Sequence, residues 1–338
     1  MVETRAGEDP MKAAGKTGIW LPLVLLPVLL VLGVCSGAFW LSPAALLHFG
    51  EADPAADPVA DLRLIRMLAA LTVGGSLALS GMVFQAVLRN PLAEPFILGV
   101  SGGAGVGAAL AIVSGLAAYS VLSLPLGALL GALAALAAVL GISRWGNRGR
   151  ENLLLSGVIT GTVAGSILMF LISIAHTDQL AGITWWMLGD LQTAEPVLLL
   201  PGMVLLLILL ALIWFYSRGL NALSIGDSEA WNLGEDTREL TLILVTAASL
   251  LAAYSVSLAG IIGFCGLIVP HLVRRVYGCD HRKITPLVFL WGADFLMFCD
   301  ILSRLPWPFK EIPIGVITSL LGGPLFLWIV NRRKRYEN

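Results

Sequence analysis

Residues 196–216 read PVLLLPGMVLLLILLALIWFY, a run of apolar and small residues without one charged side chain. A helix rises 1.5 Å per residue and needs about 20 such residues to cross about 30 Å of bilayer hydrocarbon. Further runs of this kind follow one another along the chain, the eighth of them interrupted by Pro270. The sequence therefore predicts an all-α polytopic membrane protein with about ten transmembrane helices, near 19–40, 62–87, 95–116, 119–142, 152–175, 195–216, 239–258, 261–278, 284–303 and 312–331.

The composition of the chain excludes most soluble functions. Of 338 residues, 57% are hydrophobic and 13% are charged, and the mean hydropathy is +0.87. Soluble domains carry about 25% charged residues. The charged fraction of this chain is about half of that, too little to cover the surface of a soluble protein of this size. A net charge of −1 provides no basic field for phosphates, so nucleic acid is not an expected partner. The expected surroundings are instead a lipid bilayer.

Lysine and arginine set the predicted orientation, because cytoplasmic loops are enriched in both. With both termini in the cytoplasm, 17 of the 21 basic residues lie inside and four lie outside, namely Arg63, Arg66, Arg304 and Lys310. Only short polar segments separate the apolar runs. The sequence thus predicts a polar, mobile cytoplasmic tail at 1–17 and a single transmembrane domain at 18–338 of a multi-pass membrane protein.

Two glycine-containing patterns invite a chemical interpretation. Ala14-Gly15-Lys16-Thr17 ends like a phosphate-binding loop, but Pro10 stands where that loop needs a glycine. We therefore expect no ATP site in this chain. Glycines also recur every four residues, which lets helix backbones approach closely in a membrane. Tight packing is the simpler reading and sliding during gating is the alternative, for Gly99, Gly103, Gly107 and for Gly157, Gly161, Gly165.

Two carboxylates in the ninth run are candidate functional groups, because ionisable residues inside a membrane are rare and often functional. Asp300 and Arg304 lie four residues apart, on one helix face, which predicts a salt bridge. Asp294 lies off that face, where it would line a water-filled cavity. The four histidines are scattered and the four cysteines lie far apart, so no metal site and no catalytic constellation is expected.

Three longer stretches carry a resemblance to a known family. The first contains Arg63-Leu64-Ile65-Arg66 and Arg89-Asn90-Pro91-Leu92-Ala93-Glu94-Pro95, and the second is 223–234, LSIGDSEAWNLG. The third joins 263–271, GFCGLIVPH, to Asp300, Arg304 and 311–315, EIPIG. Together they resemble the FecCD-type, or type II, permeases of ATP-binding-cassette importers for iron–siderophores, haem and vitamin B12.

The resemblance implies roles for particular positions. In the family, a cytoplasmic loop forms a short coupling helix against the ATPase, which corresponds here to Gly226, Asp227, Ser228, Glu229, Ala230, Trp231, Asn232, Leu233 and Gly234. Family members usually have a small or basic residue where this chain has Trp231. Outer arginines of the family contact the binding protein, which implies docking roles for Arg63, Arg66 and Arg304. The family's inner gate corresponds to Asn90, Pro91 and Leu92.

The resulting hypothesis is a homodimeric permease with its pathway between two copies. Two ATPase subunits would hold ATP and magnesium, a periplasmic binding protein would deliver the cargo, and this subunit would bind no cofactor and catalyse no reaction. The alternative is a secondary transporter driven by protons, with Asp294 as the carrier.

Overall fold

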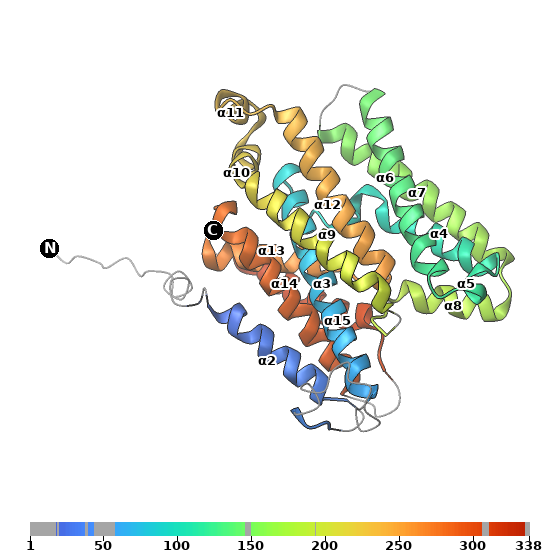
Figure 1. Ribbon diagram of the computed structural model, residues 1–338. Helices are drawn as coiled ribbons and strands as arrows, with labels where there is room; N and C mark the ends of the chain where they lie inside the picture. Colours follow the sequence, from blue (N-terminus) through green and yellow to red (C-terminus); the bar gives the residue numbers. More distant parts are fainter. Residues whose placement is uncertain are drawn as a thin grey trace.

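The computed structural model describes residues 18, 20–37, 40–43, 58–145, 150–192, 194–305 and 311–334, and every element in these ranges is a helix. Figure 1 shows long helices lying side by side, most of them running between the same two ends of the molecule. Each of the ten apolar runs contains one. They are α2 (Leu21–Cys35), α3 (Pro58–Val87), α4 (Val100–Val113), α6 (Ser123–Trp145), α7 (Arg150–Ile174), α9 (Pro196–Phe215), α12 (Thr237–Ala259), α13 (Cys265–Tyr277), α14 (His281–Arg304) and α15 (Ile314–Lys334).

The helices differ in length more than the apolar runs do. Six of them, α3, α6, α7, α9, α12 and α14, are long and apolar enough to cross a membrane. The predicted span at 261–278 becomes the 13-residue helix α13, which continues through Pro270. The predicted tail at 1–17, with its Ala14–Thr17 pattern, lies outside the described residues.

Short helices lie between the long ones, some where the hydropathy pattern left loops and one, at 95–98, inside the predicted span at 95–116. They are η2 (Pro95–Leu98), α5 (Leu116–Tyr119), α8 (Thr177–Met187), α10 (Ser217–Ile225) and α11 (Asp227–Asn232). The helix α8 packs Ile183 against a small apolar cluster that includes Leu168 and Leu171 of α7. Burial of this one face stabilises a helix too short to cross the membrane.

The helix α3 forms the centre of the fold, and it is buried over most of its length. It packs against α14, α12 and α13, and its glycines permit the closest of these contacts. A Cβ atom added to Gly81 would lie 1.8 Å from the Gly266 carbonyl oxygen, and one added to Gly74 would lie 2.3 Å from that of Gly292. Backbone-to-backbone contact of this kind is how membrane helices associate without a hydrophobic driving force between them.

The glycine pattern in α4 has the packing role that the spacing suggests. A Cβ atom on Gly103 would lie 2.4 Å from the carbonyl oxygen of Gly131 in α6, and one on Gly107 would lie 2.0 Å from that of Gly127. The stripe on α7 is used only in part. Gly157 contacts the backbone at Ile97, whereas a Cβ atom on Gly165 would meet nothing within 4 Å.

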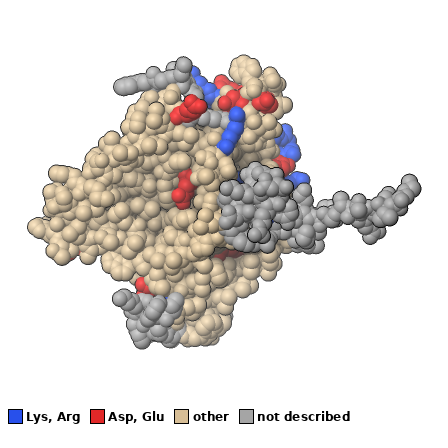
Figure 2. Space-filling model, turned by 180° about the vertical axis from the view of Figure 1, so that it is seen from behind, with Lys and Arg blue, Asp and Glu red and all other residues tan. Residues whose placement is uncertain are grey.

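The two ends of the bundle differ in charge. We call the end that holds α10 and α11 the α11 end, and the end that holds Arg66 the Arg66 end. In Figure 2 the visible Lys and Arg side chains lie in the upper half of the molecule, the half in which Figure 1 places α11, and most of the surface below them is uncharged apart from a few Asp and Glu side chains. This distribution fits the predicted placement of the α11 end in the cytoplasm, which stays a prediction.

Candidate coupling and gating site

The predicted gate residues form a tight turn that follows α3 at the α11 end. Arg89 has a left-handed backbone conformation, with φ of 49°. The Oδ1 atom of Asn90 accepts a hydrogen bond from the backbone N–H of Leu92 at 2.9 Å, and the N–H of Ala93 donates to the Asn90 carbonyl oxygen at 3.0 Å. Pro91 and Leu92 are exposed. The turn therefore presents an apolar side chain on a locally braced backbone.

Three polar side chains attach this turn to the rest of the bundle. The Gln85 amide nitrogen donates to the carbonyl oxygens of Ala93 at 3.3 Å and Gly266 at 3.1 Å. Arg274 donates to the other end of the Gln85 amide. The Glu94 carboxylate accepts from the backbone N–H of Phe264 at 2.7 Å. Because Gly266 and Phe264 begin α13, a shift of α13 and a shift of the turn are mechanically linked.

Arg89 connects the same turn to the coupling segment. Its Nε atom donates to the Leu223 carbonyl oxygen at 3.0 Å, and its Nη2 atom pairs with Oδ1 of Asp227 at 3.1 Å. Leu223 lies in α10 and Asp227 begins α11. The turn at Asn90, Pro91 and Leu92 thus begins directly after a residue that contacts the predicted coupling helix.

The residues 226–234, predicted as a coupling helix, contain the six-residue helix α11. Ala230 is buried against the bundle, whereas Trp231 and Leu233 are 69% and 70% exposed. The other exposed members of the segment are Asp227, Ser228, Glu229, Asn232 and Gly234. Gly226 is buried before α11, and Gly234 ends the segment with φ of 84°. Large apolar side chains exposed at a polar end of a membrane protein mark an interaction surface.

Asp280 fixes the base of α10 to α14. Its carboxylate accepts from the Asn221 amide at 2.9 Å and caps the first turn of α14 through the backbone N–H of Arg282. Hydrogen bonds from the Arg282 and Asn221 side chains hold the pKa of Asp280 well below its usual range. The helix α10, which leads into the coupling segment, is therefore held against the start of α14 by charged and polar contacts.

At the Arg66 end, a buried ion cluster joins three parts of the chain. Arg66 of α3 pairs with Asp300 of α14 at 2.6 Å and with Glu311 before α15. Asp300 also pairs with Arg304 at 2.8 Å, which confirms the predicted i,i+4 salt bridge. Asp300 is fully buried. Two guanidinium groups around one carboxylate compensate the cost of removing that charge from water.

Arg63 and Arg304 bind the end of α2. Arg63 donates to the carbonyl oxygen of Val34 at 3.1 Å, and Arg304 donates to those of Gly33 at 2.9 Å and Ser36 at 3.2 Å. The last carbonyl groups of a helix lack internal partners, and cations near them also favour the helix dipole. Arg63, Arg66 and Arg304 are each less than a tenth exposed. Their docking role stays a prediction, and the structure assigns them internal contacts that the sequence did not indicate.

Asp294 lies away from this cluster, as its spacing predicted, and lines a cavity beside α2. The lining of this cavity is almost entirely apolar, which differs from the water-filled cavity expected from the sequence. Within the described residues, no group of three His, Cys, Asp or Glu side chains is arranged to hold a metal ion. The two groups that sequence reasoning missed are Arg89 as a link to Asp227 and Glu311 as a partner of Arg66. Both lie in stretches that the motifs contain, but their partners are distant in the sequence.

A bundle of long apolar helices with an exposed helix at one charged end is the architecture of a multi-pass membrane protein. Comparison with known proteins places this chain among them. Residues 25–332 match the model of the FecCD transport family, and the chain belongs to that family. It is thus a permease subunit of an ABC importer and not a catalytic enzyme.

Named relatives and a solved structure agree with this assignment. The chain is 38% identical over 320 residues to the hemin transport system permease protein HmuU of Yersinia pestis, covering 94% of this chain and 96% of the relative. It is also 38% identical over 306 residues to the cobalamin import system permease protein BtuC of Halobacterium salinarum, covering 88% and 79%. A solved inward-facing ABC transporter of metal-chelate type matches with a TM-score of 0.82 and 32% identity, over 94% of this chain and 99% of that one.

Proposed function

We propose that this permease imports an iron chelate, haem or cobalamin across the bacterial inner membrane, receiving it from a periplasmic binding protein and driven by separate ATPase subunits. The two relatives named for haemin and for cobalamin are both 38% identical to this chain, over 320 and 306 residues. Overall similarity therefore leaves the cargo open among these bulky chelates. The observation that carries the proposal is the contact of Arg89 with Asp227, which links a candidate gate to a candidate ATPase-docking helix.

The exposed side of α11 fits the surface of a partner subunit. Trp231 and Leu233 are exposed while Ala230 anchors the helix to the bundle. An aromatic side chain that becomes buried on binding commonly dominates the binding energy of an interface, and the exposed Trp231 would supply one. In this proposal the ATPase pair binds ATP and magnesium, moves α11, and moves the turn at Asn90, Pro91 and Leu92 through Arg89.

A surface on α7 fits the predicted pathway between two copies of the chain. Thr162, Ser166 and Ser173 are exposed, and their spacing of four and seven residues places them on one face of the helix. Each hydroxyl donates back to a carbonyl oxygen of its own helix, so the face is polar without carrying charge. A weakly polar wall of this kind lets a large chelate pass without binding it tightly.

The proposed orientation places the α11 end in the cytoplasm and the Arg66 end toward the binding protein. Arg63, Arg66 and Arg304 remain the proposed docking residues, because they gather at the end opposite α11. Their internal bonds mean that docking would involve an exchange of partners, with Glu311 and Gln192 at the more exposed edge of the cluster. Basic residues facing acidic residues on a partner would steer their association.

Reconstitution into liposomes tests the proposal. The permease is combined with its ATPase and binding protein, and uptake of ferric siderophore, haem and cobalamin is measured together with ATP hydrolysis. We expect ATP-dependent uptake of one of these cargoes. Trp231→Ala should lower ATPase binding, while Thr237→Ala, a change at the start of the next helix, serves as the control. Uptake without the ATPase that collapses with an uncoupler would instead establish the proton-driven alternative.

A further inference from the structure

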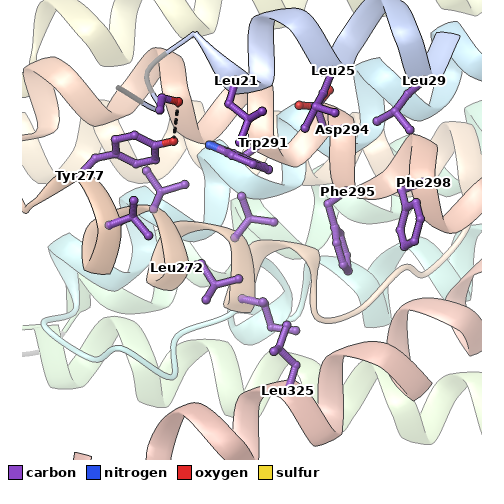
Figure 3. A pocket seen from close by; sticks show the side chains of 15 residues that line it. Leu21, Leu25, Leu29, Leu272, Tyr277, Trp291, Asp294, Phe295, Phe298 and Leu325 are labelled. Carbon is purple, nitrogen blue, oxygen red and sulfur yellow. Dashed lines mark hydrogen bonds between the residues drawn. The ribbon is translucent and has the colours of Figure 1, made fainter. Parts of the chain in front are cut away.

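A cavity of about 580 Å³ lies between α2, α13, α14 and α15, apart from the gate turn and from the α7 face. Figure 3 shows Leu25 and Leu29 of α2 on one side of it, Leu272 of α13 and Leu325 of α15 on the other, and Phe295 and Phe298 along α14. Tyr277 at one end donates its hydroxyl to the Gly18 carbonyl oxygen at 2.9 Å. The walls are otherwise almost entirely apolar.

Asp294 is the exception among these walls. Figure 3 places its carboxylate between Leu25 and Trp291, within the cavity lining. The residue is 3% exposed, and neither carboxylate oxygen has a hydrogen-bond partner among the described residues. The indole N–H of Trp291, one turn earlier, lacks one there as well. Leaving a buried carboxyl without any partner is costly, so such a group needs an explanation.

The described basic groups near the cavity are either bonded to other residues or lie outside its lining. Asp300, also on α14, has Arg66 and Arg304, whereas the lining of the cavity contains no Lys or Arg. The helix α2 has no charged residue from Leu21 to Cys35. On α13, Arg274 donates to Gln85 and Arg275 lies outside the lining. Among the described residues, the chain therefore surrounds Asp294 with an apolar space and supplies no cation within it.

We propose that this cavity binds a lipophilic amine, with the ammonium group on Asp294 and the apolar body among Leu25, Leu29, Leu272, Phe295 and Phe298. The volume falls within the range of small-molecule pockets, about 300–1,000 Å³. Leu21 and Phe298, at 49% and 45% exposed, form an edge through which a ligand dissolved in the bilayer reaches it. An acyl chain alone fills the apolar space but offers nothing to the carboxylate. Water in turn needs two to four polar partners, which this lining does not provide.

A pair of probes with the same apolar body tests the charge. The purified full-length permease is titrated with dodecylamine and, separately, with dodecanol, and the bound ligand is counted by native mass spectrometry. We expect the amine to bind at least tenfold more tightly, about 1.4 kcal/mol. Asp294→Asn, which keeps the shape and removes the charge, should abolish this preference. Asp178→Asn, at an exposed carboxylate of α8, should retain it.

A second variant tests the location without altering Asp294. Leu272→Trp fills the cavity and should weaken binding of both probes several-fold. Equal binding of amine and alcohol by the unmodified protein would overturn the proposal. So would an amine preference that survives Asp294→Asn, or a co-purified phospholipid that dodecylamine fails to displace. None of these measurements involves transport, so the outcome is independent of the proposed function.

Discussion

The guanidinium group of Arg89 and the carboxylate of Asp227 lie 3.1 Å apart and join the turn after α3 to the start of α11. Both side chains are partly exposed, at 34% and 56%. An ion pair of that kind contributes about 0–1 kcal/mol to stability. A contact that adds so little to folding, yet joins a candidate gate to a candidate docking helix, is better suited to transmitting motion than to holding the bundle together.

Removing either partner of this pair should therefore reduce transport more than stability. Arg89→Gln and Asp227→Asn are expected to lower ATP-driven uptake in liposomes, with a change below about 1 kcal/mol in the free energy of unfolding. The double variant should show no further loss if the two residues act as one unit. Additive losses would mean that each residue acts through a different contact.

Substitution of Gly107 should destabilise the bundle through α4 and α6. A Cβ atom there would lie 2.0 Å from the Gly127 carbonyl oxygen, so Gly107→Ala forces the helices apart at a cost of about 1–3 kcal/mol. Gly165→Ala is the matched control, because it meets open space and gains up to about 1 kcal/mol of helix propensity. Thermal unfolding in detergent measures both. Equal effects would contradict the packing role of Gly107.

Asp280 should stabilise α14 mainly as its N-cap. Asp280→Ala removes the acceptor for the Arg282 N–H and the Asn221 amide, and we expect a loss of about 0.5–2 kcal/mol. Asp280→Asn keeps a capping oxygen and loses only the exposed ion pair with Arg282. Its loss of stability should be smaller. A ranking in which asparagine is as harmful as alanine would assign the stabilisation to charge instead.

Glu311 should make stability depend on pH on the acid side. Burial acts to raise the pKa of this carboxyl, but the Arg66 guanidinium, the hydrogen bond from Gln192 and the charge of Arg304 together hold that pKa below its usual value. The ion pair therefore stabilises the folded state fully above the ordinary glutamate pKa of about 4.3. That contribution is lost as the pH falls from there through the lowered pKa. Unfolding temperatures between pH 6 and pH 3 should drop less steeply in Glu311→Gln.

Arg66 should prove essential to the bundle irrespective of any docking partner. Arg66→Met leaves Asp300 with Arg304 alone and Glu311 without its guanidinium partner, and breaking a buried pair costs about 3–5 kcal/mol. Arg66→Lys keeps the charge but not the forked guanidinium group that reaches both carboxylates. Its stability should lie between that of the unmodified protein and that of Arg66→Met. Unfolding and capture of the binding protein are measured on the same samples. Weakened capture without loss of stability would identify Arg66 as a docking residue only.

Much of the fold follows from local sequence. The run at 196–216 and its counterparts each contain a helix, because bilayer hydrocarbon requires every backbone group to bond within its own segment. The i,i+4 spacing of Asp300 and Arg304 likewise predicted a contact within one helix. The helix α8 was missed, since its stability depends on packing Ile183 against α7 rather than on a long apolar run.

The sequence by itself determined the membrane class, the positions of the apolar helices and the resemblance to the FecCD family, because each is encoded in contiguous residues. Only the tertiary structure decided what the scarce charges do. It placed Arg63 and Arg304 on the end of α2, Arg66 between Asp300 and Glu311, and Asp294 beside an apolar cavity. Such pairings depend on how helices far apart in the chain cross and rotate against each other. The hydropathy of the sequence contains no information about that crossing and rotation. The partner of a charge buried in the bundle, in contrast, is decided by them.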